Sequence, residues 1–333
     1  MYLEFYGLRE RPFELTSNPK YLCLTNQHQE ALSNLEYGIS SRTGITLLVG
    51  EAGTGKTTLI QAALSSERCR HVRAVWVNNP ALTRHEFLEL LARNLNLSSS
   101  ASRSKTVLLE ELEIALRETR GRGVVTALVV DEAQSMSVEL LEEVRLLANI
   151  ETPAEKLLPM LLVGQPEFGV RLEQAELRQL KQRVALRCEL LPLNLRETSL
   201  YVATRIAKAG GSAVRLFTRE AVTAIYEHSG GIPRTISVLC DNALLHGLAL
   251  GRQPVNQEIV LEVCRDFKLS HHAPRPLDAS HPSPAASAPS AVPVMSAVPP
   301  SAAERRQPAD ASEAEEARPA GSRMFTLFGG KRW

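Results

Sequence analysis

The sequence predicts a doubly wound α/β domain built on a five-stranded parallel sheet, followed by an all-helical lid domain and a disordered tail. Two patterns lead to this fold class. Five short apolar runs alternate with longer segments whose apolar residues recur every three or four positions. After Leu193 the strand-like runs stop and only the helical periodicity remains. Because alternating strands and helices form a parallel sheet covered on both faces, the first part is α/β and the second is helical.

Short apolar runs with the length of buried strands occur at five places. The predicted strands are Ile45–Val49, Val72–Val77, Val124–Val130, Leu157–Val163 and Val184–Leu190. Amphipathic segments separate them, and a capping box of Thr83 and Glu86 opens one of these. The helices predicted between the strands are Thr57–Ser65, Arg84–Leu95, Lys105–Arg120, Val138–Ile150 and Glu167–Gln182. The helices predicted for the second domain are Glu197–Ala209, Thr218–His228, Pro233–Leu250 and Gln257–Phe267.

These elements divide the chain into four parts. The α/β domain spans residues 1–193, including an N-terminal segment 1–43, and the helical domain spans 194–270. Alanine, proline and serine make up 31 of the next 50 residues, a composition that buries too little apolar surface to fold. We therefore expect a disordered linker over 271–322. Residues 323–333 contain phenylalanine and tryptophan again, and we interpret them as a short docking peptide.

The composition excludes several classes of protein. Lys+Arg number 38 and Asp+Glu 37, so the net charge of +1 excludes binding to polyanions through bulk charge. The five cysteines form no Cys-x-x-Cys pair, which favours buried thiols over a disulfide framework or a zinc site. No apolar run approaches the ~20 residues of a transmembrane helix, and the N-terminus does not resemble a secretory signal. These features predict a cytoplasmic protein with no transmembrane segment.

A glycine-rich motif follows the first predicted strand and opens the next helix. It consists of Gly50-Glu51-Ala52-Gly53-Thr54-Gly55-Lys56-Thr57, with Thr58 next. The motif fits the phosphate-binding pattern Gly-x4-Gly-Lys-Ser/Thr in the strand–turn–helix context that this pattern requires. Its glycines let backbone N–H groups surround a phosphate at the N-terminus of a helix. We therefore expect residues 50–58 to bind ATP, Lys56 to reach the β- and γ-phosphates, and Thr57 to ligate Mg²⁺.

Two adjacent acids follow the third predicted strand, in the run Ala127-Leu-Val-Val-Asp131-Glu132-Ala-Gln134. At the tip of this strand we expect Asp131 to hold Mg²⁺ through water and Glu132 to orient and polarise the attacking water. Phosphoryl transfer depends on such positioning more than on covalent chemistry. The alternative is an acidic turn after a buried strand, and the spacing of about 75 residues from the phosphate loop favours the catalytic interpretation.

Together the two motifs resemble the AAA+ branch of P-loop ATPases, and further segments are similar to the ExeA / general secretion pathway protein A group. These segments are Phe5–Phe13, Tyr21-Leu22, Ala31-Leu32, Tyr37-Gly38, Val163–Glu167 and Leu180–Val184. The resemblance covers about residues 2–268. It implies an Mg²⁺-dependent ATP hydrolase with the AAA+ architecture. Related ATPases serve secretion, pilus and exopolysaccharide loci, and more distant ones assist DNA transposition.

The family pattern implies roles for residues outside the two motifs. Gln165 matches the polar sensor after the fourth strand, where it contacts the γ-phosphate or the attacking water. Arg183 matches the finger arginine that enters a neighbouring subunit's site, with Arg178 as the second candidate. Arg234, at the start of a helix, matches the second sensor through which the lid reads the nucleotide. Two apolar residues are candidates for contact with the adenine: Phe13 and Ile232.

The expected function is ATP hydrolysis coupled to assembly or regulation of a secretion, pilus or exopolysaccharide machine. The implied partners are other copies of the chain and an envelope or secretion protein reached through the C-terminal tail. Such a partner places a cytoplasmic protein at the periphery of the inner membrane. A DNA-dependent ATPase that regulates transposition or recombination is the alternative. It rests on a basic stretch, for which we favour a subunit interface, formed by Arg171, Arg178, Lys181, Arg183 and Arg187.

Overall fold

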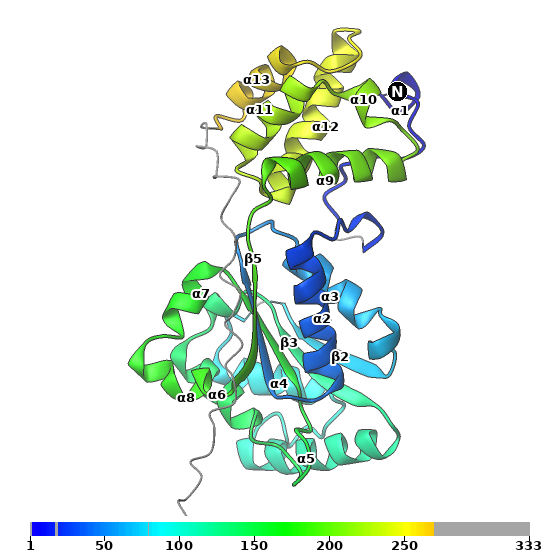
Figure 1. The fold of residues 1–333 in the computed structure, drawn as a ribbon. Coiled ribbons are helices and arrows are strands. Elements are labelled where there is room, and N and C mark those ends of the chain that lie inside the picture. The colour runs from blue at the N-terminus through cyan, green and yellow to red at the C-terminus, as the bar shows by residue number, and fades with distance from the viewer. Residues whose placement is uncertain (1, 17–18, 79, 270–333) are drawn as a thin grey trace, which may run out of the picture. The chain divides into compact units, whose positions relative to one another are not determined.

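A five-stranded, all-parallel sheet forms the centre of the first domain in the computed structural model (Figure 1). The structure describes residues 2–16, 19–78 and 80–269. These residues fall within one compact unit that spans residues 1–279. The predicted linker over 271–322 and the predicted docking peptide 323–333 lie outside the described residues.

The strand order in the sheet is β2-β3-β4-β1-β5. The strands are β1 (Ile45–Gly50), β2 (Val72–Val77), β3 (Val125–Val130), β4 (Met160–Gly164) and β5 (Val184–Leu190). The three central strands are buried along their whole length, as parallel strands covered on both faces must be. The predicted parallel α/β fold is therefore confirmed, and the segments after β1, β3 and β4 leave the sheet at the same carboxyl edge.

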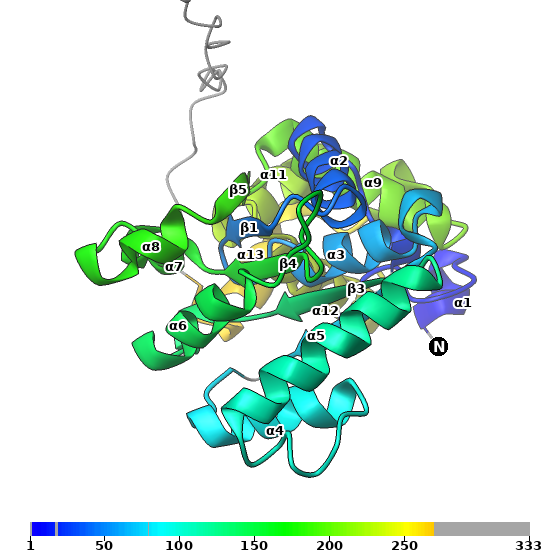
Figure 2. The same cartoon turned by 90° about the horizontal axis from the view of Figure 1, so that it is seen from below.

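Helices cover both faces of this sheet, as Figure 2 shows. One core lies under α4–α6 and includes Phe87, Leu108 and Leu141, and the other lies under α2 and α3 and includes Leu35 and Leu59. The helices are α2 (Asn26–Ser40), α3 (Lys56–Leu64), α4 (Arg84–Asn94), α5 (Lys105–Gly121), α6 (Val138–Leu147), α7 (Pro166–Arg171) and α8 (Arg178–Lys181). Four single turns of 3-10 helix are η1 (Pro19–Tyr21), η2 (Glu67–Cys69), η3 (Ala133–Ser135) and η4 (Ala175–Leu177).

The predicted helix over Glu167–Gln182 is wrong. The chain forms α7, η4 and α8 in succession, because the backbone turns after Arg171 and again near residue 177. Phe168, Leu172, Leu177 and Leu180 nevertheless all lie in the same core, and two of the steps between them, of four and three residues, are those of a helical face. The predicted strand Leu157–Val163 also begins too early, since β4 starts only after Pro159.

The second domain is a bundle of helices. It consists of α9 (Leu195–Lys208), α10 (Ala213–Leu216), α11 (Arg219–Ser229), α12 (Pro233–Ala249) and α13 (Gln257–Asp266). The four longer helices correspond to the four predicted ones, and α10 was not predicted. Their shared core is apolar and includes Ile225, Leu239 and Val260. Among the described residues, no helix combines the length and the apolar character needed to span a bilayer.

The start of the chain packs into the helical bundle and not onto the sheet. Helix α1 (Tyr2–Tyr6) lies beside α12, where the Tyr6 hydroxyl donates to the Leu244 carbonyl over 3.0 Å (Figure 1). The Phe13 ring meets the Phe217 ring edge-on at a centroid distance of 6.3 Å. The predicted α/β domain includes the whole segment 1–43, but within its described residues α2 and Leu22 pack against the core on the sheet, whereas Tyr2, Tyr6, Leu8 and Phe13 belong to the core of the lid.

Candidate nucleotide-binding site

The phosphate loop leaves the sheet at the end of β1 and enters α3, as the motif predicts. Gly53 and Gly55 adopt φ angles of +85° and +95°, which residues with a side chain rarely adopt. The Thr54 hydroxyl donates to the Glu51 carbonyl over 2.8 Å and closes the turn. The loop therefore has the backbone conformation that a row of inward-facing N–H groups requires.

Lys56 folds back over this loop. Its ammonium donates to the carbonyls of Gly50 and Glu51 at 2.7 Å and 2.9 Å, and the side chain is buried. Burial lowers the pKa of Lys56, while the nearby carboxylates of Glu132 and Asp131 act in the opposite direction. A cation that is held between carbonyls in a buried loop is placed to exchange these contacts for phosphate oxygens.

Thr57 and Asp131 come together although they are 74 positions apart. The Thr57 hydroxyl donates to Asp131 Oδ2 over 2.9 Å. Among the described residues, no cluster of three or more His, Cys, Asp and Glu side chains is placed to hold a metal. One carboxylate and one hydroxyl nevertheless fit Mg²⁺, which in nucleotide sites keeps several waters and takes its other ligands from phosphates.

Glu132 is fixed at the end of β3 by three neighbours. Its backbone has a φ of +54°, and its N–H donates to Asp131 Oδ1 over 2.9 Å. Its carboxylate accepts from the Gln134 side chain and, over 3.3 Å, from Gln165 Nε2. The Gln165 N–H donates to Gln134 Oε1 over 3.2 Å. A non-glycine residue in the left-handed region is strained, and here the strain lies at the acid expected to orient water.

The lid touches the phosphate loop through its longest helix. The Arg234 N–H, in the first turn of α12, donates to the Gly53 carbonyl over 3.2 Å. A Cβ on Gly53 would lie only 2.7 Å from the Arg234 Cβ and 3.1 Å from Ile232 Cγ2. Arg234 itself is exposed. The contact brings the predicted second sensor next to the loop and requires a glycine at position 53.

A short connection joins the lid to β5 and is held from both sides. The Gln27 side chain forms two hydrogen bonds with the backbone of Leu191, of 3.0 Å and 3.1 Å. The Leu193 N–H donates to the Gly231 carbonyl over 2.8 Å. The first turn of α2 and the turn before α12 therefore position the connection between the two domains.

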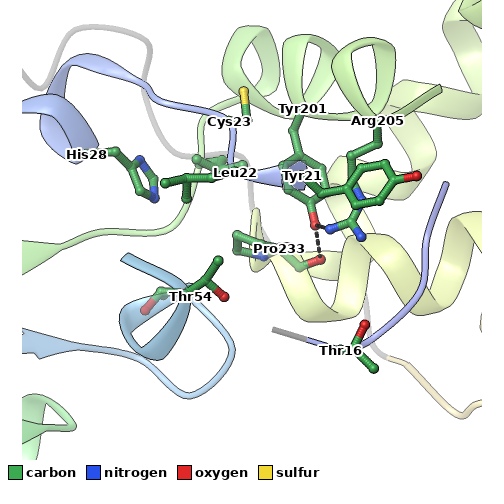
Figure 3. Close-up of a pocket in the computed structure, with 12 residues that line it drawn as sticks. Thr16, Tyr21, Leu22, Cys23, His28, Thr54, Tyr201, Arg205 and Pro233 are labelled. Carbon is green, nitrogen blue, oxygen red and sulfur yellow. Dashed lines mark hydrogen bonds between the residues drawn. The ribbon is translucent and has the colours of Figure 1, made fainter. Parts of the chain in front are cut away.

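A pocket beside the loop is lined by the N-terminal segment, the loop and the lid (Figure 3). Phe13 is not among its lining residues, because its ring is buried in the lid core, and the expected contact of Phe13 with the adenine stays a prediction. Ile232 lies against Gly53. The lining residues are Thr16, Tyr21, Leu22, Cys23, His28, Thr54, Gly55, Thr58, Leu193, Tyr201, Arg205 and Pro233.

Comparison with known proteins agrees with this geometry. A family profile described as an AAA domain matches residues 39–172. The chain is 38% identical over 255 residues to general secretion pathway protein A of Aeromonas hydrophila. The chain is an AAA-type P-loop ATPase related to that protein. The match covers 77% of this ATPase and 46% of the relative, so the chain spans about half the length of the relative.

Solved structures share the fold of this ATPase at lower sequence identity. The Aeropyrum pernix ORC2 protein in its ADPNP–ADP complexes has a TM-score of 0.59 and 18% identity, covering 77% of this chain and 71% of that chain. Drosophila ORC bound to DNA has a TM-score of 0.58 and 19% identity, covering 78% of this chain and 65% of that chain. At these identities the likeness establishes the AAA-type fold.

Two predicted site residues of the ATPase lie away from the loop. Arg183 is exposed and directly precedes β5, at the amino edge of the sheet, where Val184 pairs with Ile45. The six residues of β1 separate this edge from the loop by about 20 Å. Arg178, the other candidate, is the exposed first residue of α8. Arg183 therefore lies at the edge of the sheet opposite to the phosphate loop.

Sequence reasoning missed Gln134, which joins Glu132 to Gln165. The signal was its place two residues after Glu132, on the same turn. His28 was missed as well. It is buried beside the loop, where its Nδ1 lies 2.7 Å from the Thr25 hydroxyl, and burial lowers its pKa. No helix was predicted for its segment, so nothing placed it next to Thr54.

Proposed function

We propose that this ATPase binds ATP with Mg²⁺ between residues 50–58 and the acids after β3, and that it hydrolyses the γ-phosphate to drive assembly or regulation of a secretion, pilus or exopolysaccharide machine. One observation carries the proposal: Thr57 and Asp131 are bonded over 2.9 Å while Gln165 contacts Glu132 over 3.3 Å. The groups needed for a cation and for an attacking water are therefore neighbours at one edge of the sheet.

The mechanism assigns a separate task to each side chain. Lys56 exchanges the two loop carbonyls for β- and γ-phosphate oxygens and balances their charge. Glu132 accepts a hydrogen bond from water and holds it in line with the γ-phosphorus. The new P–O bond forms as the bond to the β-γ bridging oxygen breaks, and Glu132 takes up the proton that the water releases. Gln165 and Gln134 hold the Glu132 carboxylate in place.

Asp131 and Thr57 would hold the Mg²⁺ ion, Asp131 through water. When bound there, the ion would supply positive charge against the β- and γ-phosphates. The Thr57 hydroxyl donates its proton to Asp131 Oδ2, which leaves its oxygen lone pairs available for the ion. Chelation of Mg²⁺ is therefore expected to abolish turnover.

A second subunit completes the site in this proposal. Because Arg183 lies at the far edge of its own sheet, it acts only on a nucleotide bound by a neighbour, and Arg178 is the alternative donor. The rate per chain then rises with protein concentration. The relative is named a general secretion pathway protein, which supports a partner in secretion. In our proposal this partner belongs to the envelope and places the ATPase at the inner membrane. The tail 323–333 is our candidate for this contact.

The test is phosphate release by the full chain at several protein concentrations, with Mg²⁺ or EDTA and with or without duplex DNA. We expect turnover that needs Mg²⁺ and rises with concentration. Glu132→Gln is expected to lower kcat by about 10³-fold and to leave ATP binding intact, because a general base contributes about 10²–10⁴-fold. Glu139→Gln, an exposed acid on α6, is the matched control. Turnover that appears only with DNA would favour the DNA-dependent alternative, and wild-type turnover by Glu132→Gln would refute our assignment of the base.

A further inference from the structure

Arg205 on α9 is a buried cation beside the nucleotide pocket. Only 8% of the residue is exposed. Its guanidinium donates to the carbonyls of Pro12 over 2.5 Å and Glu14 over 2.9 Å, and to the Tyr201 hydroxyl over 2.7 Å. All three acceptors are neutral oxygens. Burying a charge among neutral groups is costly, so the position of this arginine needs an explanation beyond packing.

Two aromatic rings flank the same guanidinium. Its central carbon lies 4.9 Å from the centre of the Tyr21 ring and 5.3 Å from that of the Tyr201 ring. Figure 3 shows both rings and Arg205 lining one side of the pocket. Cation–π attraction offsets part of the desolvation cost. Arg205 thus joins the N-terminal segment to α9 while facing the space next to the phosphate loop.

Tyr201 continues this connection to α12. Its hydroxyl lies 2.8 Å from Ser237 Oγ and donates to the Pro233 carbonyl over 3.3 Å. Pro233 directly precedes Arg234, whose N–H donates to Gly53. A continuous path of polar contacts therefore runs from residues 12–14 through Arg205 and Tyr201 to the turn that carries the second sensor.

We propose that Arg205 and Tyr201 are positioning residues that fix the first turn of α12 to the N-terminal segment. Because both residues line the pocket beside the phosphate loop, a nucleotide bound there would set the position of Arg234 through them. This inference rests on the proposed role of Arg234 at the γ-phosphate. It means that the lid and residues 2–14 move as one body when nucleotide binds. Loss of the Tyr201 hydroxyl then weakens the preference for a triphosphate, because Arg234 is less well held.

The test compares the Kd of ADP with that of a non-hydrolysable ATP analogue, measured by calorimetry on the full chain with Mg²⁺. Tyr201→Phe keeps the ring and is expected to lower the preference for the triphosphate about fivefold, the effect of losing one or two buried hydrogen bonds. Ser237→Ala is expected to act in the same direction more weakly. Tyr6→Phe is the matched control, since it removes another buried tyrosine hydroxyl that bonds α12, at Leu244, eleven residues after Pro233.

Arg234→Ala separates the inference from the function on which it rests. If Arg234→Ala lowers the preference and Tyr201→Phe adds nothing in that background, the path acts through Arg234, as proposed. If Arg234→Ala lowers it and Tyr201→Phe does not, the path is structural and this inference fails while the proposed function stands. If Arg234→Ala has no effect, the sensor role fails and this inference fails with it. Equal losses in Tyr201→Phe and Tyr6→Phe show general loosening of the bundle and also overturn the inference.

Discussion

The α/β domain and the lid contribute to the site in different ways. In the α/β domain the functional side chains bond to one another, Thr57 to Asp131 and Gln165 to Glu132. The lid reaches the phosphate loop through its backbone, where the Arg234 N–H meets the Gly53 carbonyl. The lid also holds the N-terminal segment, through the hydrogen bonds from Arg205 to the carbonyls of Pro12 and Glu14.

This difference assigns hydrolysis to the α/β domain and the recognition of the bound nucleotide to the contact with the lid. Groups held by a rigid sheet are in place before a ligand arrives, whereas a contact made by one backbone bond is easily strengthened or replaced by a ligand. We therefore expect changes to the acids after β3 and to Gln165 to alter kcat, and changes at the lid contact to alter nucleotide affinity.

After Glu132, the largest effect is expected for Arg183, which belongs to the α/β domain but lies at its far edge. Arg183→Ala should lower kcat by about 10²-fold with little change in ATP affinity, because losing one charged donor to the transition state costs about that much. Phosphate release measures this loss, and Arg178→Ala is the control. A larger loss in Arg178→Ala would identify Arg178 as the finger.

Mixing two inactive variants shows whether the arginine acts in trans. Arg183→Ala keeps an intact loop, and Lys56→Ala keeps the arginine, so mixed oligomers contain some complete sites. We expect the mixture to recover part of the wild-type turnover. A mixture as inactive as its components would contradict a site shared between subunits.

A smaller effect is expected where the lid meets the loop. Gly53→Ala introduces a Cβ 2.7 Å from the Arg234 Cβ at a φ of +85°, and should weaken ATP binding about tenfold, since such strain costs roughly 1–3 kcal/mol. Gly55→Ala is the matched control, because its φ is +95° and no heavy atom lies within 4 Å of the added Cβ. Calorimetry with ATP and Mg²⁺ measures both. Equal losses would mean that the lid contact contributes nothing beyond backbone strain.

The smallest effect concerns stability at the junction of the two domains. Burial lowers the pKa of His28 below its usual 6.5, so just below this pH the unfolded chain binds a proton that the folded chain does not. Stability therefore falls as the pH drops below about 6.5, down to the folded pKa. Urea unfolding at about pH 7.5 and 5.5 should show a smaller fall for His28→Asn than for the wild type. His85→Asn, at an exposed position, should behave like the wild type.

Much of the α/β domain could be predicted from local patterns. Because buried parallel strands are continuous apolar runs, the sequence predicted the position of β3 and of the two acids that follow it. The loop motif needed a strand before it and a helix after it, and both are present. The meeting of Thr57 with Asp131 follows from the shared carboxyl edge of parallel strands.

The remaining features depend on contacts between distant parts of the chain. The Tyr6 hydroxyl bonds Leu244, 238 positions away, and no local pattern encodes that partner. The role of Gln134 depends on its contact with Gln165, which follows β4 and is distant in the sequence, so no local pattern indicated it. The prediction of one helix over 167–182 was wrong for a related reason: tertiary packing bends the chain, while Phe168 and Leu172 keep the four-residue spacing of a helix.

The most direct test of the central claim is the Kd of ATP in the presence of Mg²⁺, measured by calorimetry for the wild-type chain and for Lys56→Ala. The account predicts one ATP bound per chain with a Kd in the micromolar range, and a loss of at least about 30-fold on removal of the Lys56 ammonium, whose charge-assisted bonds to phosphate carry this difference. A wild-type chain that does not bind ATP, or a Lys56→Ala chain that binds it equally well, would contradict a nucleotide held in the loop of residues 50–57.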